Sequence, residues 1–170
     1  MSKNNDEILS SLSGKLRKAT KTKTILAAPI KYAKDMGYAT DEGVILTLEG
    51  PITVDLSDAS LHLCRGLEQG EVWVQSYAKI CEKYDMRGSP LMFWQPCVPK
   101  PDNKVFAAQV TDRDTFTIDA KWGTLNGVKG DYVLAHPTDL EDVWIVRKDL
   151  FESTYTFIKM CCCGGGCKKA

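Results

Sequence analysis

The chain has 170 residues, and its 22 lysine and arginine residues balance its 22 aspartate and glutamate residues, so the formal net charge at pH 7 is zero. This balance argues against a general nucleic-acid-binding protein, because neutralising phosphates with basic residues supplies most of the non-specific affinity of that class. Hydrophobic residues make up 44% of the chain, enough for a folded core, yet no apolar run approaches the roughly 20 residues that a membrane-spanning helix needs.

The N-terminus and the cysteines indicate a cellular location. The first residues are polar, unlike a secretory signal peptide, and Ser2 stands where N-myristoylation requires glycine. The seven cysteines are an odd count, which without a signal peptide is typical of reduced thiols in a cytosol-like compartment. We therefore expect a cytoplasmic protein, either free, peripheral at a membrane or within a larger assembly.

Residues 1–24 are expected to form a basic amphipathic N-terminal arm. Ile8, Leu12 and Leu16 recur every four residues, as on one face of a helix. Gly14 weakens this prediction, because glycine costs roughly 1 kcal/mol relative to alanine within a helix. Basic amphipathic helices bind membrane surfaces or partner grooves, and an arm that packs one side on the body of the protein explains the pattern as well.

Residues 25–86 are expected to form a first β-rich unit. Its predicted strands are short apolar or alternating segments bounded by turn residues, at residues 44–48, 52–56, 61–64 and 71–74. Ser76 is the expected N-cap of a short helix that carries Tyr77 and Ile80 on one face.

Residues 87–103 are expected to be a proline-rich connector, punctuated by Gly88, Pro90, Pro96, Pro99 and Pro101. Within it, residues 91–94 are too apolar to remain in water, so we expect them to pack against one or both units.

Residues 104–158 are expected to form a second β-rich unit. Its predicted strands lie at residues 105–110, 115–118, 122–125, 131–134 and 142–146. Asp149 is the expected cap of a following helix, with Glu152 three residues later as in a capping box.

The two units repeat the same order of features. A shift of 71 residues places Trp73 on Trp144 and Tyr84 on Tyr155, each tryptophan following an acidic residue and a valine. Each unit is too small to bury its own sheet face, so packing the copies together would cover both. We therefore predict an α+β fold of two similar small β-rich units, each with a short C-terminal helix, plus the N-terminal helical arm.

The second unit resembles an uncharacterised family named for a Pro-Gly-Asp-Tyr-Gly motif. The matching segments are 129–133, 142–146 and 151–155, while Lys129 replaces the proline and Val133 the last glycine. No activity is established for that family, so the resemblance implies a fold and no chemistry.

A cleft between the units would gather the candidate ligand or interface residues. These are Trp73, Trp122, Trp144, Asp131, Tyr132, Glu71 and Asp142. The two acids before the tryptophans would form a general acid/base pair if the copies face each other, although acids at such positions more often begin a surface strand. For the Gly-Asp-Tyr segment, a structural turn is the better interpretation.

Motifs for other chemistry are absent from the sequence. His62 and Cys64 are spaced as metal ligands can be, but no CxxC or HExxH motif accompanies them. No phosphate-binding glycine loop and no nucleophile signature is present, so we predict no catalytic residue and no cofactor.

The C-terminal residues 159–170 form a cysteine-rich tail with Cys161, Cys162, Cys163 and Cys167. Clustered thiols beside lysines can be acylated and anchor a chain to membranes, bind zinc or copper(I), cross-link to partners, or remain unmodified.

These observations favour a non-catalytic structural or interaction protein, an assembly component or a membrane-attached adaptor. The expected partner is another protein or a second copy of the chain, with membrane attachment through the tail and no specific nucleic acid. Two alternatives remain open: an enzyme or small-ligand-binding protein with a cleft between the repeats, and a protein that binds metal through the tail thiols.

Overall fold

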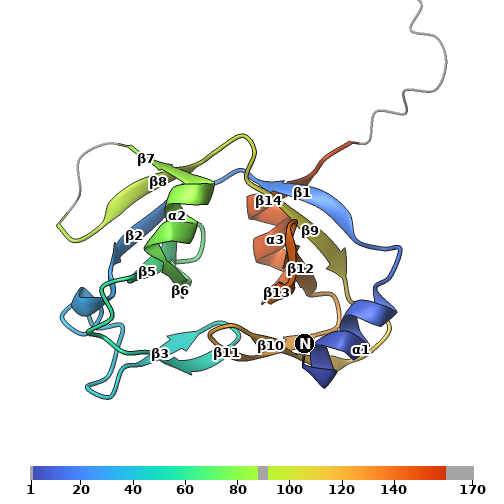
Figure 1. Ribbon diagram of the computed structural model, residues 1–170, viewed down its shortest axis with the longest axis horizontal. Helices are drawn as coiled ribbons and strands as arrows, with labels where there is room; N and C mark the ends of the chain where they lie inside the picture. Colours follow the sequence, from blue (N-terminus) through green and yellow to red (C-terminus); the bar gives the residue numbers. More distant parts are fainter. Residues whose placement is uncertain (1, 88–91, 160–170) are drawn as a thin grey trace, which may run out of the picture.

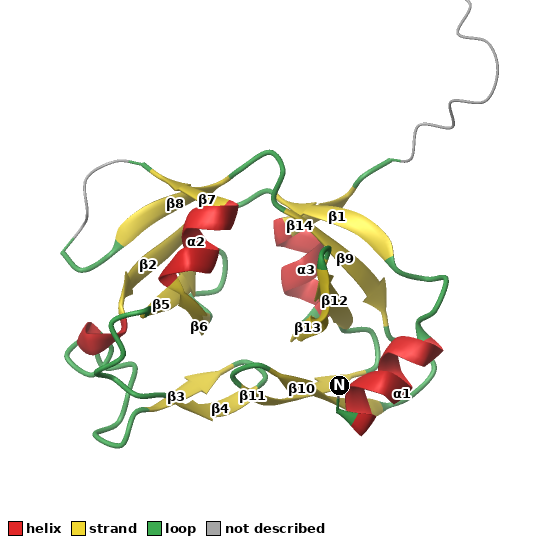
Figure 2. Cartoon of the chain, in the orientation of Figure 1, coloured by secondary structure: helices red, strands yellow, loops and turns green. Residues whose placement is uncertain are grey.

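The computed structural model describes residues 2–87 and 92–159. Most of this part is β-structure, arranged as two five-stranded and two two-stranded antiparallel sheets with three short α-helices (Figure 2). The chain therefore has the predicted mixture of helix and sheet, dominated by strands.

The first sheet has the strand order β6-β5-β2-β8-β7. Its strands are β2 (Ile25–Pro29), β5 (Leu61–Gly66), β6 (Val72–Ser76), β7 (Tyr84–Met86) and β8 (Gln95–Pro99). The helix α2 (Tyr77–Lys83) links the edge strands β6 and β7 across the sheet, and the side chain of Ser76 accepts a hydrogen bond from the Lys79 amide at its start. The predicted cap at Ser76 is confirmed.

The second sheet has the strand order β13-β12-β9-β1-β14. Its strands are β1 (Arg17–Lys21), β9 (Lys104–Gln109), β12 (Tyr132–His136), β13 (Asp139–Val146) and β14 (Tyr155–Phe157). The helix α3 (Lys148–Thr154) links the edge strands β13 and β14, so α2 and α3 face each other between the two sheets (Figure 1).

Two hairpins close the space below the helices (Figure 1). They are β3 (Val44–Thr47) with β4 (Gly50–Thr53), and β10 (Thr115–Ala120) with β11 (Gly123–Val128). The Asn126 amide donates a 3.3 Å hydrogen bond to the Glu49 carbonyl, which joins the two hairpins. A short 3-10 helix (Ile30–Tyr32) follows β2.

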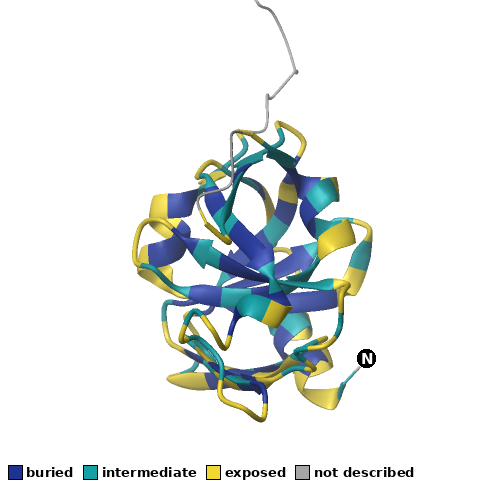
Figure 3. Ribbon diagram, turned by 90° about the vertical axis from the view of Figure 1, so that its left-hand side faces the viewer, coloured by how far each residue is buried: buried dark blue, intermediate teal, exposed yellow. Residues whose placement is uncertain are grey.

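Buried residues occur along the strands, as the dark blue parts of the ribbon in Figure 3 show, and their apolar side chains form several clusters. One cluster packs α1 (Lys3–Ser11) through Ile8 and Leu12 against β9, β10 and β12. A second cluster joins β3 through Ile45 to the first sheet. Trp122 packs against both clusters, so the turn between β10 and β11 connects the two halves.

The predicted N-terminal arm is correct only for its helix. Residues 3–11 are helical, but residues 17–21 form β1, which lies inside the second sheet between β9 and β14. Its hydrogen-bonding partners are more than eighty residues away in sequence, at Ala107 and Phe157 among others. The charged sequence of β1 hides this role, because only Ala19 of the strand is fully buried.

The predicted connector at residues 87–103 is also wrong in part. Residues 95–99 form β8, which lies between β2 and β7 in the first sheet. Pro96 and Pro99 argued against a strand, since proline removes a ladder donor and is found mainly at sheet edges. The burial of Cys97, which faces Ile25 across the sheet, accounts for this strand. Phe93, from the apolar stretch in the same segment, stacks on Tyr32 with 4.5 Å between the ring centres.

Two further local predictions differ from the structure. The N-cap of α3 is Arg147 without a side-chain hydrogen bond, so the predicted capping box at Asp149 and Glu152 is wrong. The amide of Lys148 is instead bonded by a side chain from another part of the sequence, as described below. Trp122 lies in the turn before β11 and not in a strand.

Candidate functional site

A cavity of about 90 Å³ lies between the two sheets. Residues of β6 and α2 line it from the first sheet, residues of β1, β9, β13 and α3 from the second, and the hairpin turns at Glu49 and Trp122 line it as well. Both halves of the chain and both hairpins are therefore needed to form this cavity.

Aromatic side chains make up much of the cavity wall. Three of the four tryptophans of the chain contribute, together with two tyrosines at the ends of α2 and α3; they are Trp73, Trp122, Trp144, Tyr84 and Tyr155. Burial raises the pKa of both tyrosines, so both hydroxyls are protonated across the neutral range.

Lys21 reaches this cavity from the end of β1. Its Nζ lies 4.6 Å from the ring centre of Trp73, 5.6 Å from that of Tyr155 and 5.9 Å from that of Tyr84. Within the described residues, this ammonium group has no hydrogen bond or ion pair. Its pKa is lowered from 10.5 to about 8, chiefly by burial; the charges of Cys64 and Glu71 oppose the shift, and the charge of Lys83 contributes to it.

Lys83 lies at the C-terminal end of α2 and is also buried, with 7% of its surface exposed. Its Nζ lies 4.9 Å from the ring centre of Trp144. Burial lowers its pKa, and the neighbouring charge of Lys79 lowers it further. The cavity therefore has a second lysine ammonium that carries no ion pair within residues 2–87 and 92–159.

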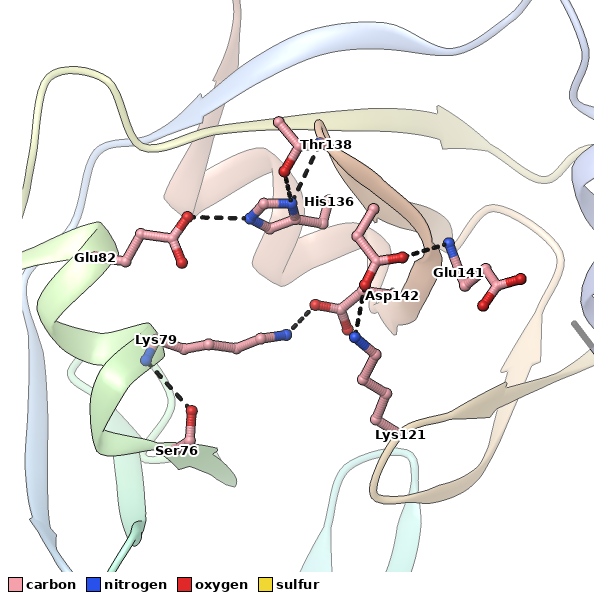
Figure 4. A network of polar contacts seen from close by, with 9 residues as sticks. Ser76, Lys79, Glu82, Lys121, His136, Thr138, Glu141 and Asp142 are labelled. Atoms are coloured by element: carbon pink, nitrogen blue, oxygen red, sulfur yellow. Dashed lines mark hydrogen bonds and ion pairs between the residues drawn. The ribbon is translucent and has the colours of Figure 1, made fainter.

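An ion pair crosses the cavity region between the two halves. Lys79 of α2 pairs with Asp142 of β13, whose surface is only 1% exposed (Figure 4). Close by, Lys121 bonds Asp139 at 2.7 Å and His136 contacts Glu82 at 3.3 Å. These last two contacts lie nearer the surface, so only the first is enclosed.

Several buried polar atoms around the cavity lack a hydrogen-bond partner. Six buried side-chain nitrogen or oxygen atoms in the described part of the chain are unpaired in this way, and four belong to cavity-lining residues. The four are Glu71 Oε2, Gln75 Oε1, Asn103 Nδ2 and Asp142 Oδ1. Buried polar groups are normally hydrogen-bonded, so this concentration of unpaired donors and acceptors at one cavity requires an explanation.

Glu49 is the third acidic residue of the lining. Burial raises the pKa of its carboxyl group above the usual range, although hydrogen bonds from its own segment partly oppose the shift. The lining thus combines three lysines with three acidic side chains, of which one pair is already matched.

The structure brings together five of the seven predicted ligand or interface residues. Trp73, Trp122, Trp144, Glu71 and Asp142 all line the cavity.

Asp131 and Tyr132 lie elsewhere. The two carboxylate oxygens of Asp131 accept hydrogen bonds from the Lys148 amide at 3.1 Å and the Val128 amide at 3.0 Å. The ring of Tyr132 stacks on Phe151 with 3.9 Å between ring centres. Residues 129 and 130 form a turn, as predicted, and Asp131 in addition holds the start of α3, which was not predicted.

The lysines were missed by the sequence analysis. Lys79 and Lys83 are four residues apart, a spacing that places both on one face of α2. Their position opposite Asp142 depends on the pairing of distant strands, which no local pattern reveals.

Metal ligands do not gather in the part of the structure that is described: no group of three or more His, Cys, Asp or Glu side chains there could hold an ion. Burial raises the pKa of Cys64 and raises that of Cys97 to about 11, so both are protonated thiols. Cys81 is partly exposed. The four cysteines of the predicted acylation or metal site lie outside the described residues.

No family model, curated protein or solved structure matches this chain. Among the helices that the structure describes, none combines the length and the apolar character needed to cross a membrane.

Proposed function

We propose that this protein binds a small polar molecule in the cavity between its two sheets. The observation that carries the proposal is a set of unpaired polar groups around one space. Four buried polar atoms have no partner in the described residues, and neither buried Lys83 nor partly buried Lys21 forms an ion pair there. Each unpaired buried group costs about 1–3 kcal/mol, and a ligand that pairs with several of them recovers much of that cost.

The cavity limits the size of the ligand. An engineered apolar cavity of about 150 Å³ accommodates benzene. Benzene has six non-hydrogen atoms, so a space of about 90 Å³ fits roughly four non-hydrogen atoms if the walls do not move. This size suits a small organic acid or amino compound and not a nucleotide.

The chemistry of the lining favours a ligand that both accepts and donates hydrogen bonds. Lys21, Lys83 and Asn103 supply donors, whereas Glu71 and Gln75 supply acceptors. The tryptophan rings add apolar walls and exclude water, which strengthens electrostatic interactions inside the cavity.

This proposal includes the duplication expected from the sequence, with the cavity lying between the two copies. Support comes from the matching orders β6-β5-β2-β8-β7 and β13-β12-β9-β1-β14, in which a helix follows β6 and β13 alike. The helices α2 and α3 are also offset by the 71 residues that relate the tryptophans. In this interpretation the first strand of each copy, β1 or β8, belongs to the sheet of the other copy.

The other sequence predictions stay predictions. A role in assembly, a protein partner, membership of the Pro-Gly-Asp-Tyr-Gly family and attachment through the cysteine tail have no further support among the described residues. We give the ligand-binding alternative precedence because its residues line one cavity.

A thermal-shift screen of the full-length protein tests the proposal. Compounds of up to about five non-hydrogen atoms that carry both an anionic group and a hydrogen-bond donor should raise the melting temperature, in line with mass action on the folded state. The variant Gln75→Leu should lose most of the shift, and Trp94→Phe, away from the cavity, should retain it. A panel in which no small polar compound raises the melting temperature would overturn the proposal and favour the assembly role.

A further inference from the structure

We propose that Lys21 forms an imine with a small carbonyl compound that carries a carboxylate, such as a short oxo acid, inside this cavity. This inference rests on the proposed function and specifies its ligand class. It follows from the position of Lys21, from the presence of Lys83 and Glu71 in the lining of the same cavity, and from the volume of that cavity.

Lys21 lies among aromatic rings and forms no ion pair with the described residues. Its Nζ is bordered by the rings of Trp73, Tyr84 and Tyr155, and it has no hydrogen-bond acceptor among the described residues. A lysine in an apolar site or beside another cation is activated in this way as a nucleophile. Lys21 meets both conditions, because Lys83 lines the same cavity.

The protonation state of Lys21 supports this role. Burial lowers its pKa to about 8, so about a quarter of the molecules carry the neutral amine at pH 7.5, against about one in a thousand for an ordinary lysine. Only the neutral amine has the lone pair that attacks a carbonyl carbon. Lys21 is therefore enriched in the reactive form by about two orders of magnitude.

The reaction balances without a further reactant. The Nζ lone pair forms a bond to the carbonyl carbon while the C=O π electrons move to oxygen, which gains a proton as nitrogen loses one. The resulting carbinolamine loses its hydroxyl group and a proton as water when the C=N bond forms. Lys21 and one carbonyl compound thus give one imine and one water.

Other cavity residues fit these steps. Glu71 lines the cavity and its negative charge acts on Lys21, which suits it to accept the proton released by nitrogen. The ammonium of Lys83 suits the carboxylate of the ligand, because it is buried and has no acidic partner within hydrogen-bonding distance in the described chain. Glyoxylate, an oxo acid of five non-hydrogen atoms, exceeds the size estimated above by about one atom and is the smallest compound that carries both a carbonyl group and a carboxylate.

Reductive trapping tests the inference directly. The full-length protein is incubated with glyoxylate and sodium cyanoborohydride near neutral pH, and the modified lysine is located by peptide mass mapping. We expect one carboxymethyl group on Lys21, formed at least about tenfold faster than on any other lysine because of its larger neutral fraction. In the wild-type chain, the trapping rate at Lys21 should level off above about pH 8 and not continue to rise towards 10.5.

Matched variants complete the test. Lys21→Arg and Lys21→Met should lose the selective adduct, whereas Lys18→Arg, an exposed position on the same strand, should keep it. Uniform labelling of the lysines, or selective labelling of Lys83, would overturn the inference. Either result can be seen in the wild-type protein, so the test does not depend on the variants folding.

Glycolate, which cannot form an imine, separates the two proposals: if it raises the melting temperature while glyoxylate is not trapped at Lys21, only the imine fails. If neither compound stabilises or modifies the protein, both proposals fail.

Discussion

Only 1% of the surface of Asp142 is exposed. Its carboxylate forms an ion pair with Lys79, which comes from the other half of the chain. The net contribution of such a buried pair to stability is small, but removing one partner leaves a buried charge without compensation. This asymmetry makes the pair a sensitive probe of how the two halves meet.

Lys79→Met should therefore lower the free energy of unfolding by roughly 3–5 kcal/mol, because the carboxylate of Asp142 stays buried and unpaired. Urea denaturation measures the change. The exposed pair of Lys121 and Asp139 provides the control, since Lys121→Met should cost at most about 1 kcal/mol. Equal costs for the two variants would show that Asp142 reaches solvent.

Lys21 should give the protein a characteristic dependence on pH. Its pKa is about 8 in the folded chain and 10.5 in the reference state, so between these values the unfolded chain holds a proton that the folded chain has released. The contribution of Lys21 to the free energy of unfolding consequently rises with pH from about 8 to about 10.5 and is constant outside this window.

The difference in unfolding free energy between wild type and Lys21→Met isolates this effect. It should increase by about 1–3 kcal/mol across the window, a value reduced from the full shift because Lys21 is only partly buried. The comparison is necessary because the thiol of Cys97, with its pKa raised to about 11, destabilises the fold as pH rises through the same range. A difference that is independent of pH would mean that Lys21 is solvated.

At the residue level, the acids and tryptophans that line the cavity were among the residues predicted from the sequence, but its lysines were not. Glu71 with Trp73 and Asp142 with Trp144 recur at one offset, which drew attention to them. A lysine in sequence is most often a solvated residue, and only the three-dimensional arrangement shows that Lys21 lies among aromatic rings.

At the scale of secondary structure, Asp131 is a connector between elements. Its side chain binds the amides of Val128 at the end of β11 and Lys148 at the start of α3. It thereby supplies the hydrogen bond that Arg147, the N-cap of α3, does not make.

Asp131→Ala should lower the free energy of unfolding by about 1–2 kcal/mol, the usual cost of losing a helix cap. Ligand-induced thermal shifts should be unchanged at temperatures where the variant is folded, because Asp131 does not line the cavity. Loss of ligand response without loss of stability would instead place Asp131 in a binding site.

The strands found and missed by sequence analysis differ in a physical respect. The strands of the hairpins β3–β4 and β10–β11 each pair with the next strand in the sequence, and their residues show alternating or apolar patterns. β1 shows no such pattern: it is rich in charged residues, and it is positioned by strands from the far end of the chain. Tertiary pairing of this kind overrides local preference.

Because β1 lies between β9 and β14, its backbone amides should resist hydrogen exchange as strongly as those of β9. Ala19→Asp, at a fully buried position of β1, should unfold the second sheet, whereas Lys18→Asp should be tolerated. Rapid exchange throughout residues 17–21 would restore the predicted free arm and contradict the strand.

At the scale of the whole molecule, the two sheets exchange strands: β1, which precedes β2, belongs to the second sheet, and β8, which precedes β9, belongs to the first. The chain therefore crosses between the halves near Lys21 and again near Asn103, and both residues line the cavity. This arrangement couples the integrity of the cavity to the association of the halves.

The tryptophan indole signals in a proton–nitrogen NMR spectrum provide the most direct measurement of whether the central cavity is a ligand site. Three of the four tryptophans line it, and Trp94 does not, so the protein carries its own control. On titration with glycolate, the account predicts saturable shifts of the signals of Trp73, Trp122 and Trp144 with Trp94 unmoved. Absence of any shift at saturating concentration, or a change confined to Trp94, would contradict it.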